Sequence, residues 1–172
     1  MKATIQHVAT GAAFVLLSAM TAAAQPVHFS KILPLLPDKV EGFTAEKPDG
    51  STTSMAGFNM SIVSREYRKG EGDDEQRVTI KISDGTGNEM FKAMHAAMPE
   101  FSNETTEGYE KGFKLDGNPA VEKYTTESKD GSLTVFLGGR FLVETETHGL
   151  DKDAMQTWLK KIDLKKLAEL KP

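Results

Sequence analysis

The sequence predicts an α+β fold, in which one antiparallel β-sheet has helices packed on it. Three observations carry this prediction. Residues 76–83 alternate polar and apolar side chains, which is the period of a strand with one buried face. Gly138-Gly139 separates two apolar runs, as in a β-hairpin. Residues 87–98 and 154–162 instead place their apolar side chains at helical spacing.

The first 24 residues have the pattern of a secretory signal peptide. Lys2 gives a positive start, an apolar run extends from Val8 to Met20, and Ala22-Ala23-Ala24 supplies the small residues that signal peptidase accepts. The run is too short to span a bilayer, which needs about 20 apolar residues. We therefore expect cleavage after Ala24 and one mature domain of residues 25–172.

The composition narrows the class of protein. Removal of residues 1–24 takes away one basic residue and leaves 20 basic and 25 acidic residues, a net charge of −5. A mildly acidic chain has no long-range attraction for nucleic acid or anionic lipid. Cysteine is absent, which excludes disulfides, thiolate metal sites, thiol catalysis and a lipoprotein anchor. An exported domain without cysteine favours the periplasm of a Gram-negative bacterium.

The first half of the mature chain predicts a short helix followed by strands. Phe29, Ile32, Leu33 and Leu36 lie at helical spacing, and Pro34 keeps that helix short. A turn is expected at Pro48-Asp49-Gly50. Strands are expected at residues 42–47, 60–67 and 76–83, with residues 70–75 as the tip of a hairpin.

A helix and a linker then separate two groups of strands. Thr86 and Glu89 have the spacing of a capping box at the start of the helix, and Pro99 ends it. Residues 100–107 are polar and are expected to be a linker without regular structure.

The second group of strands begins near Tyr109 and includes the Gly138-Gly139 hairpin. Its strands are expected to cover residues 121–126, 133–137 and 140–147. A two-residue turn places Phe136 opposite Phe141, and Val135 opposite Leu142. These apolar pairs lie on opposite faces, so we expect the hairpin to be central in the sheet and covered on both sides. The chain then ends in helices, with Asp151 as one N-cap and Asp163 starting the last helix.

The order of elements resembles that of PsbP-like domains, including the DcrB-type periplasmic proteins. The resemblance extends over residues 40–165 and rests on element order and on the Gly138-Gly139-Arg140 hairpin before the last helices. In that group, helices sandwich a twisted antiparallel sheet. The resemblance implies a non-catalytic accessory or ligand-binding module, although a fold does not by itself specify a function.

Arg140 is the first candidate for ligand binding. It begins a strand directly after two glycines, and its planar guanidinium suits a carboxylate or a phosphate. The alternative is an ordinary ion pair on the sheet with Glu144 or Glu122.

Met90, Met94, His95 and Met98 form the second candidate site. They recur along one side of the predicted helix, and thioether and imidazole ligands select Cu(I). The alternative is that these side chains are the buried face of the helix, because methionine fills irregular gaps in cores.

No enzyme motif accompanies these candidates. The chain has no Gly-x-Ser-x-Gly, no His-Glu-x-x-His and no P-loop, although pairs of carboxylates stay open as active-site residues. We expect a soluble, exported, non-catalytic periplasmic accessory or binding protein. It would bind a partner protein or small ligand, with no cofactor, no nucleic acid and no stable membrane anchor. The alternative is a periplasmic copper-handling protein that uses the Met/His helix.

Overall fold

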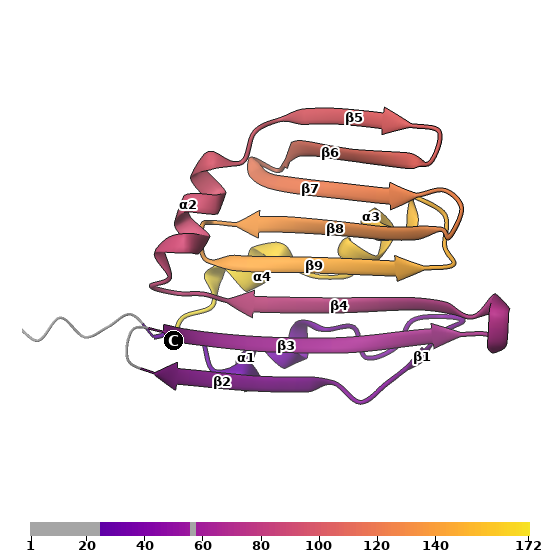
Figure 1. The fold of residues 1–172 in the computed structure, drawn as a ribbon. Helices are drawn as coiled ribbons and strands as arrows, with labels where there is room; N and C mark the ends of the chain where they lie inside the picture. The colour runs from indigo at the N-terminus through magenta and orange to yellow at the C-terminus, as the bar shows by residue number, and fades with distance from the viewer. Residues whose placement is uncertain (1–24, 56–57) are drawn as a thin grey trace, which may run out of the picture.

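One antiparallel sheet dominates the structure (Figure 1). The computed structural model describes residues 25–55 and 58–172, so the predicted signal peptide lies outside the described residues. The nine-stranded sheet has the order β1-β3-β4-β9-β8-β7-β6-β5, and β2 also pairs with β3. The predicted α+β class and single antiparallel sheet are confirmed.

The bounds of the elements follow the chain. The strands are β1 Thr44–Ala45, β2 Asp49–Met55, β3 Phe58–Lys69, β4 Gln76–Asp84, β5 Phe101–Thr105, β6 Gly108–Leu115, β7 Asn118–Thr125, β8 Asp130–Leu137 and β9 Phe141–His148. The helices are α1 Phe29–Ile32, α2 Glu89–Ala97, α3 Ala154–Leu159 and α4 Leu164–Glu169, with 3₁₀ turns η1 Leu33–Leu35 and η2 Gly72–Asp74.

The main core lies between one face of the sheet and α1, α3 and α4, which lie behind the strands in Figure 1. On β4, Val78, Ile80 and Ile82 are fully buried, as the alternating pattern predicted. Their neighbours in the core include Met155 and Trp158 of α3. The apolar side chains at every second residue of the strand therefore pack against the apolar stripe of α3 in one core.

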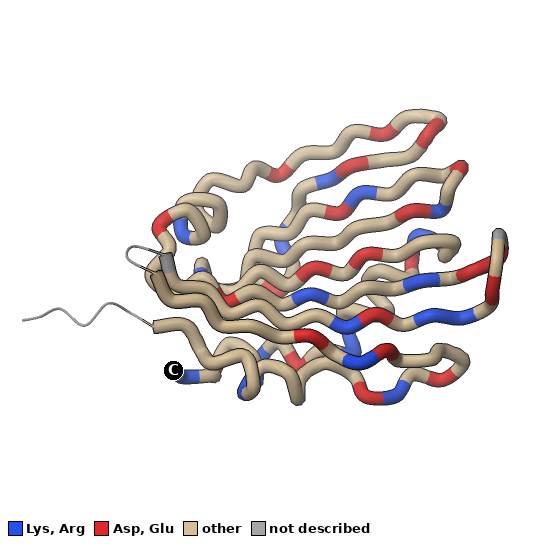
Figure 2. The backbone as a smooth tube through the Cα atoms, turned by 60° about the horizontal axis from the view of Figure 1, so that its bottom comes forward, with Lys and Arg blue, Asp and Glu red and all other residues tan. Residues whose placement is uncertain are grey.

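The opposite face, called here the open face, takes the alternate strand residues that point away from the core, among them Arg77, Lys81 and Glu146. Figure 2 shows that charged residues recur along these strands. Of the helices that the structure describes, α2 is the one that approaches the open face, at the end where β8 turns into β9. Phe91 of α2 and Phe136 of β8 are buried, although neither belongs to the main core. Because α2 contacts β8 on this face and the main core lies on the other, the hairpin is covered on both faces near its turn.

The β8–β9 hairpin turns at the predicted glycines, but its loop has three residues rather than two and its register differs. Gly138 and Gly139 have φ angles of 60° and 65°, as such a turn requires. However, Leu137 lies opposite Phe141, and Phe136 lies opposite Leu142. Arg140 is a third loop residue, and its side chain donates to Asp84. The predicted pairing of Phe136 with Phe141 is therefore wrong by one residue.

Three local predictions before and after α2 are wrong. Asp49 and Gly50 begin β2 rather than forming a turn with Pro48, and residues 100–107 contain the edge strand β5. Asn88, not Thr86, caps α2, since its side chain accepts a hydrogen bond from the backbone N–H of Met90 at 2.9 Å. The Thr86 hydroxyl instead donates to Asp84.

The predictions for the starts of the two C-terminal helices have different outcomes. Asp153 occupies the N-cap position of α3 without a side-chain hydrogen bond, so the cap expected at Asp151 is wrong. The start of the last helix at Asp163 is confirmed, and the Asp163 carboxylate also caps α4 by accepting from the backbone N–H of Lys166 at 2.9 Å.

Candidate binding site

Arg140 lies in a buried ion pair. Its Nε and Nη2 atoms donate to the two carboxylate oxygens of Asp84, at 3.1 and 2.8 Å. Its Nη1 atom donates to the carbonyl of Leu170 at 2.8 Å. The alternative partners Glu144 and Glu122 are therefore wrong. A ligand role for Arg140 stays a prediction, and any ligand would meet a guanidinium whose three nitrogens already have partners.

Asp84 is fully buried and is satisfied from several directions. Besides Arg140, its Oδ1 atom accepts from the backbone N–H and the hydroxyl of Thr86 at 2.9 and 2.6 Å. Its Oδ2 atom accepts from the backbone N–H of Val27 at 2.6 Å. A buried carboxylate needs such compensation for its lost hydration. Arg140 therefore has a structural role, compensating the charge of buried Asp84, that requires no ligand.

The Met/His helix is exposed rather than buried as core. Met90 and Met94 keep 60% and 39% of their surface exposed, and Phe91 is the buried residue of α2. His95 and Met98 are half-buried. The prediction that this stripe is ordinary core is therefore wrong for Met90 and Met94. Their thioethers lie at the surface, where they are accessible to a soluble ligand.

A second buried carboxylate lies under α3. Glu122 is 2% exposed and accepts hydrogen bonds from Tyr109 at 2.6 Å, Lys111 at 2.8 Å and Gln156 at 2.8 Å. Burial alone raises the pKa of Glu122, but these three bonds together hold it below its ordinary value. Burial and the bond to Glu122 raise the pKa of Tyr109. Glu122 is therefore an ionised acceptor, and Tyr109 is a protonated donor.

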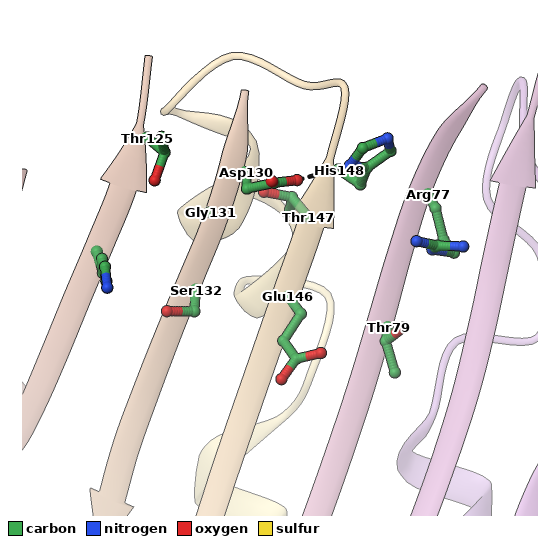
Figure 3. A pocket seen from close by; sticks show the side chains of 10 residues that line it. Arg77, Thr79, Thr125, Asp130, Gly131, Ser132, Glu146, Thr147 and His148 are labelled. Carbon is green, nitrogen blue, oxygen red and sulfur yellow. Dashed lines mark hydrogen bonds and ion pairs between the residues drawn. The ribbon is translucent and has the colours of Figure 1, made fainter. Parts of the chain in front are cut away.

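The candidate binding site is a groove of about 470 Å³ on the open face (Figure 3). It crosses four neighbouring strands, β4, β9, β8 and β7. Its lining side chains are mainly polar or charged: Arg77, Thr79, Lys123, Thr125, Asp130, Ser132, Glu146, Thr147 and His148, with Gly131. Because alternate residues of a strand share a face, the outward positions of these strands meet in one surface.

The centre of the groove carries one charge of each sign. Lys123 and Glu146 both lie opposite Ser132, one strand to either side of it. Two strand spacings separate their backbones by about 9–10 Å. Within the described residues, neither Lys123 nor Glu146 forms an ion pair. Both charges are thus available to a ligand.

A hydrogen bond between His148 and Asp130 closes one end of the groove. His148 Nδ1 lies 2.6 Å from Asp130 Oδ1. A hydrogen bond from Ser128 and the contact with His148 lower the pKa of Asp130. In Figure 3, the ring of His148 points away from Ser132. The three side chains therefore lack the nucleophile–base hydrogen bond of a catalytic triad.

The sequence contained only part of the signal for this groove. Alternation along residues 76–83 predicts that Arg77 and Thr79 point away from the core, but their partners lie on distant segments. The pairing of β4 with β9 brings Arg77 opposite His148. The structure does not bring Arg140 or the α2 methionines into this groove.

Comparisons of this chain with known proteins find no match. No family model matches the chain, and neither a curated protein nor a solved structure matches it. Among the described helices, none is long and apolar enough to cross a membrane. The described residues also contain no group of three or more His, Cys, Asp or Glu side chains that could hold a metal ion.

Proposed function

We propose that this chain is an exported, non-catalytic binding protein whose ligand lies in the groove on the open face. The observation that carries the proposal is the placement of Lys123 and Glu146 on either side of Ser132, each without an ion-pair partner among the described residues. A ligand with a carboxylate and an ammonium group at matching distance complements both charges. The hydroxyls of Ser132 and Thr79 supply further donors and acceptors.

The spacing favours a short extended peptide with free termini. Three extended residues span about 10 Å, which is close to the separation of the Lys123 and Glu146 backbones. A suitable probe is triglycine, with its acetylated and amidated form as the uncharged control. Backbone NMR shifts of β7, β8 and β9 measure binding. Saturable shifts with triglycine, absent with the blocked peptide, support the proposal.

Charge-reversal variants of the groove distinguish specific peptide binding from nonspecific electrostatic attraction. Lys123→Glu and Glu146→Lys should each weaken binding at least tenfold, because one end of the peptide then meets a like charge. The double variant should recover binding, since the peptide can lie in the opposite direction. Lys165→Glu on α4, on the other side of the sheet, is the matched control. If triglycine causes equal NMR shifts in all of these variants, the groove is not the peptide-binding site.

Export into a periplasm is the second part of the proposal. The Lys2 start, the apolar run and the Ala22-Ala23-Ala24 motif support it. Val27, just after the proposed cleavage site, is fully buried, and Gln25 is exposed. Cleavage before Gln25 therefore leaves the contacts of Val27 in place. The resemblance to PsbP-like domains is compatible with this location and stays a prediction.

A copper-handling function is the second candidate, because the Met/His helix is exposed. Met90 and Met94 lie one turn apart, as do Met94 and Met98, and His95 lies within one turn of Met98. Met90 and Met98 are about 12 Å apart along the helix axis, so one ion would use a subset of the four. Met94, common to both Met pairs, is the ligand to remove first.

Anaerobic titration with Cu(I) against a competing chelator tests this candidate. One tight equivalent, weakened at least tenfold by Met94→Leu, supports it, because leucine keeps the apolar volume and removes the thioether. Met55→Leu is the matched control, since Met55 is also an exposed methionine but lies on β2. Binding unchanged by Met94→Leu contradicts it.

A further inference from the structure

The outer edge of β2 is open to another strand. β2 pairs residue for residue with β3 from Asp49 to Met55, and no other described strand pairs with it. Alternate backbone N–H and C=O groups of its seven residues therefore point outward. An unpaired edge of this kind is a template for strand addition. Met55, at its end, is also 67% exposed, more than any other large apolar side chain that the structure describes.

β2 lacks the features that usually protect an edge. It contains no proline, lysine or arginine, and its pairing with β3 has no bulge. Its one charge is Asp49, at its first residue, so Gly50 to Met55 is uncharged. The opposite edge, β5, differs: it is five residues long, contains Glu104 and directly follows Glu100. Like charges oppose self-pairing there.

The sequence of β2 is compatible with its own antiparallel copy. With Thr52 on a two-fold axis, Thr52 faces the partner's Thr52, and Ser51 faces the partner's Thr53. Gly50 then faces the partner's Ser54, and Asp49 faces the partner's Met55. Hydroxyl pairs lie across the centre, and no like charges oppose each other. This self-complementarity is what a symmetric interface requires.

We propose that the protein forms a symmetric dimer in which β2 of two copies pair and continue the sheet across the interface. The second copy is the partner that an uncharged, self-complementary edge fits best. Because the two-fold axis of an antiparallel strand pair is perpendicular to the sheet, both open faces lie on the same side. The dimer does not depend on what the groove binds.

Sedimentation equilibrium from micromolar to millimolar concentration tests this proposal. The wild-type chain should have twice the mass of one copy. Thr53→Lys should halve that mass, because the two new ammonium groups would lie on neighbouring diagonal positions of the paired strands. Thr53 is exposed, so the fold should persist, as circular dichroism can show. Asn103→Lys on β5 is the matched control and should stay dimeric.

The absence of cysteine allows a direct test of the pairing. Residues facing each other across antiparallel strands have Cα atoms about 4.5–5.5 Å apart, which fits a disulfide. Three variants would each carry one cysteine, at position 51, 52 or 53. The variant with cysteine at position 52, on the proposed two-fold axis, should form a disulfide-linked dimer. Asn103→Cys on β5 should not form one. A wild-type monomer at every concentration, or cross-linking no stronger than that control, overturns the proposal.

Discussion

Arg140 and Asp84 form two parallel hydrogen bonds, at 3.1 and 2.8 Å, where both ends of the described chain meet the sheet. Val27, near the start, donates to the same carboxylate, and Leu170, near the end, accepts from the same guanidinium. Arg140 lies in the β8–β9 hairpin, and Asp84 ends β4. One buried ion pair therefore joins four segments that are distant in sequence.

Arg140→Ala should destabilise the protein by about 3–5 kcal/mol, because it leaves the buried Asp84 carboxylate without its counter-charge. Urea unfolding followed by circular dichroism measures the loss as a lower midpoint. Arg77→Ala is the matched control, since its ion pairs at 3.7 and 4.0 Å are partly exposed and should contribute about 0–1 kcal/mol. Similar losses in the two variants would contradict a special role for Arg140.

The same pair explains why the hairpin register was not predictable. Two glycines between apolar runs indicate a two-residue turn, and nothing local shows that Arg140 must leave the ladder. Its partner, Asp84, lies 56 residues earlier in the chain. Local pattern predicts the turn, whereas a long-range ion pair determines which residues face each other.

Burial on one face explains which elements were predictable. Val78, Ile80 and Ile82 alternate because α-helices cover one side of β4 and leave the other open. All residues of β5 are exposed, so no apolar period marks it, and only its pairing with β6 makes it a strand. The groove could not be predicted either, because β4 and β9 become neighbours only in the folded sheet.

Glu122→Gln should reduce stability by about 1–3 kcal/mol at neutral pH, since Lys111 and Tyr109 lose an ionised acceptor. The pKa of Glu122 is lowered in the folded state, so its contribution is present above its ordinary value of about 4.5. That contribution disappears as the pH falls through the lowered value. The difference between wild type and variant, measured by urea unfolding, should therefore shrink in acid. If the difference in stability between wild type and variant instead grows as the pH falls, the pKa of Glu122 is raised in the folded state rather than lowered.

Tyr67 should make the protein less stable in alkali. Burial is the main cause that raises its pKa to about 12, above the ordinary 10.0. The unfolded chain therefore releases this proton first, and stability falls as the pH rises from about 10 through about 12. Tyr67→Phe should reduce this dependence of stability on pH, although it also removes the hydrogen bond to the Pro37 carbonyl at 2.8 Å. An unchanged slope in thermal melts would assign the effect to other groups.

The proposed cleavage site gives the last prediction. A chain that begins at Gln25 should fold as stably as the full-length chain, because it keeps the buried Val27 and its 2.6 Å bond to Asp84. A chain that begins three residues later, at His28, loses both. It should be less stable by about 3–5 kcal/mol, from the loss of one buried apolar side chain and one donor to a buried charge.

Urea unfolding of the two truncated chains measures this difference, and mass spectrometry of the exported protein locates the cut. A mature mass that begins at Gln25 supports cleavage after Ala24. If the exported protein keeps Met1, or if the chain from Gln25 fails to fold, residues 1–24 are not a cleaved signal peptide. Equal stability of the two truncated chains would instead show that Asp84 does not need the backbone of Val27.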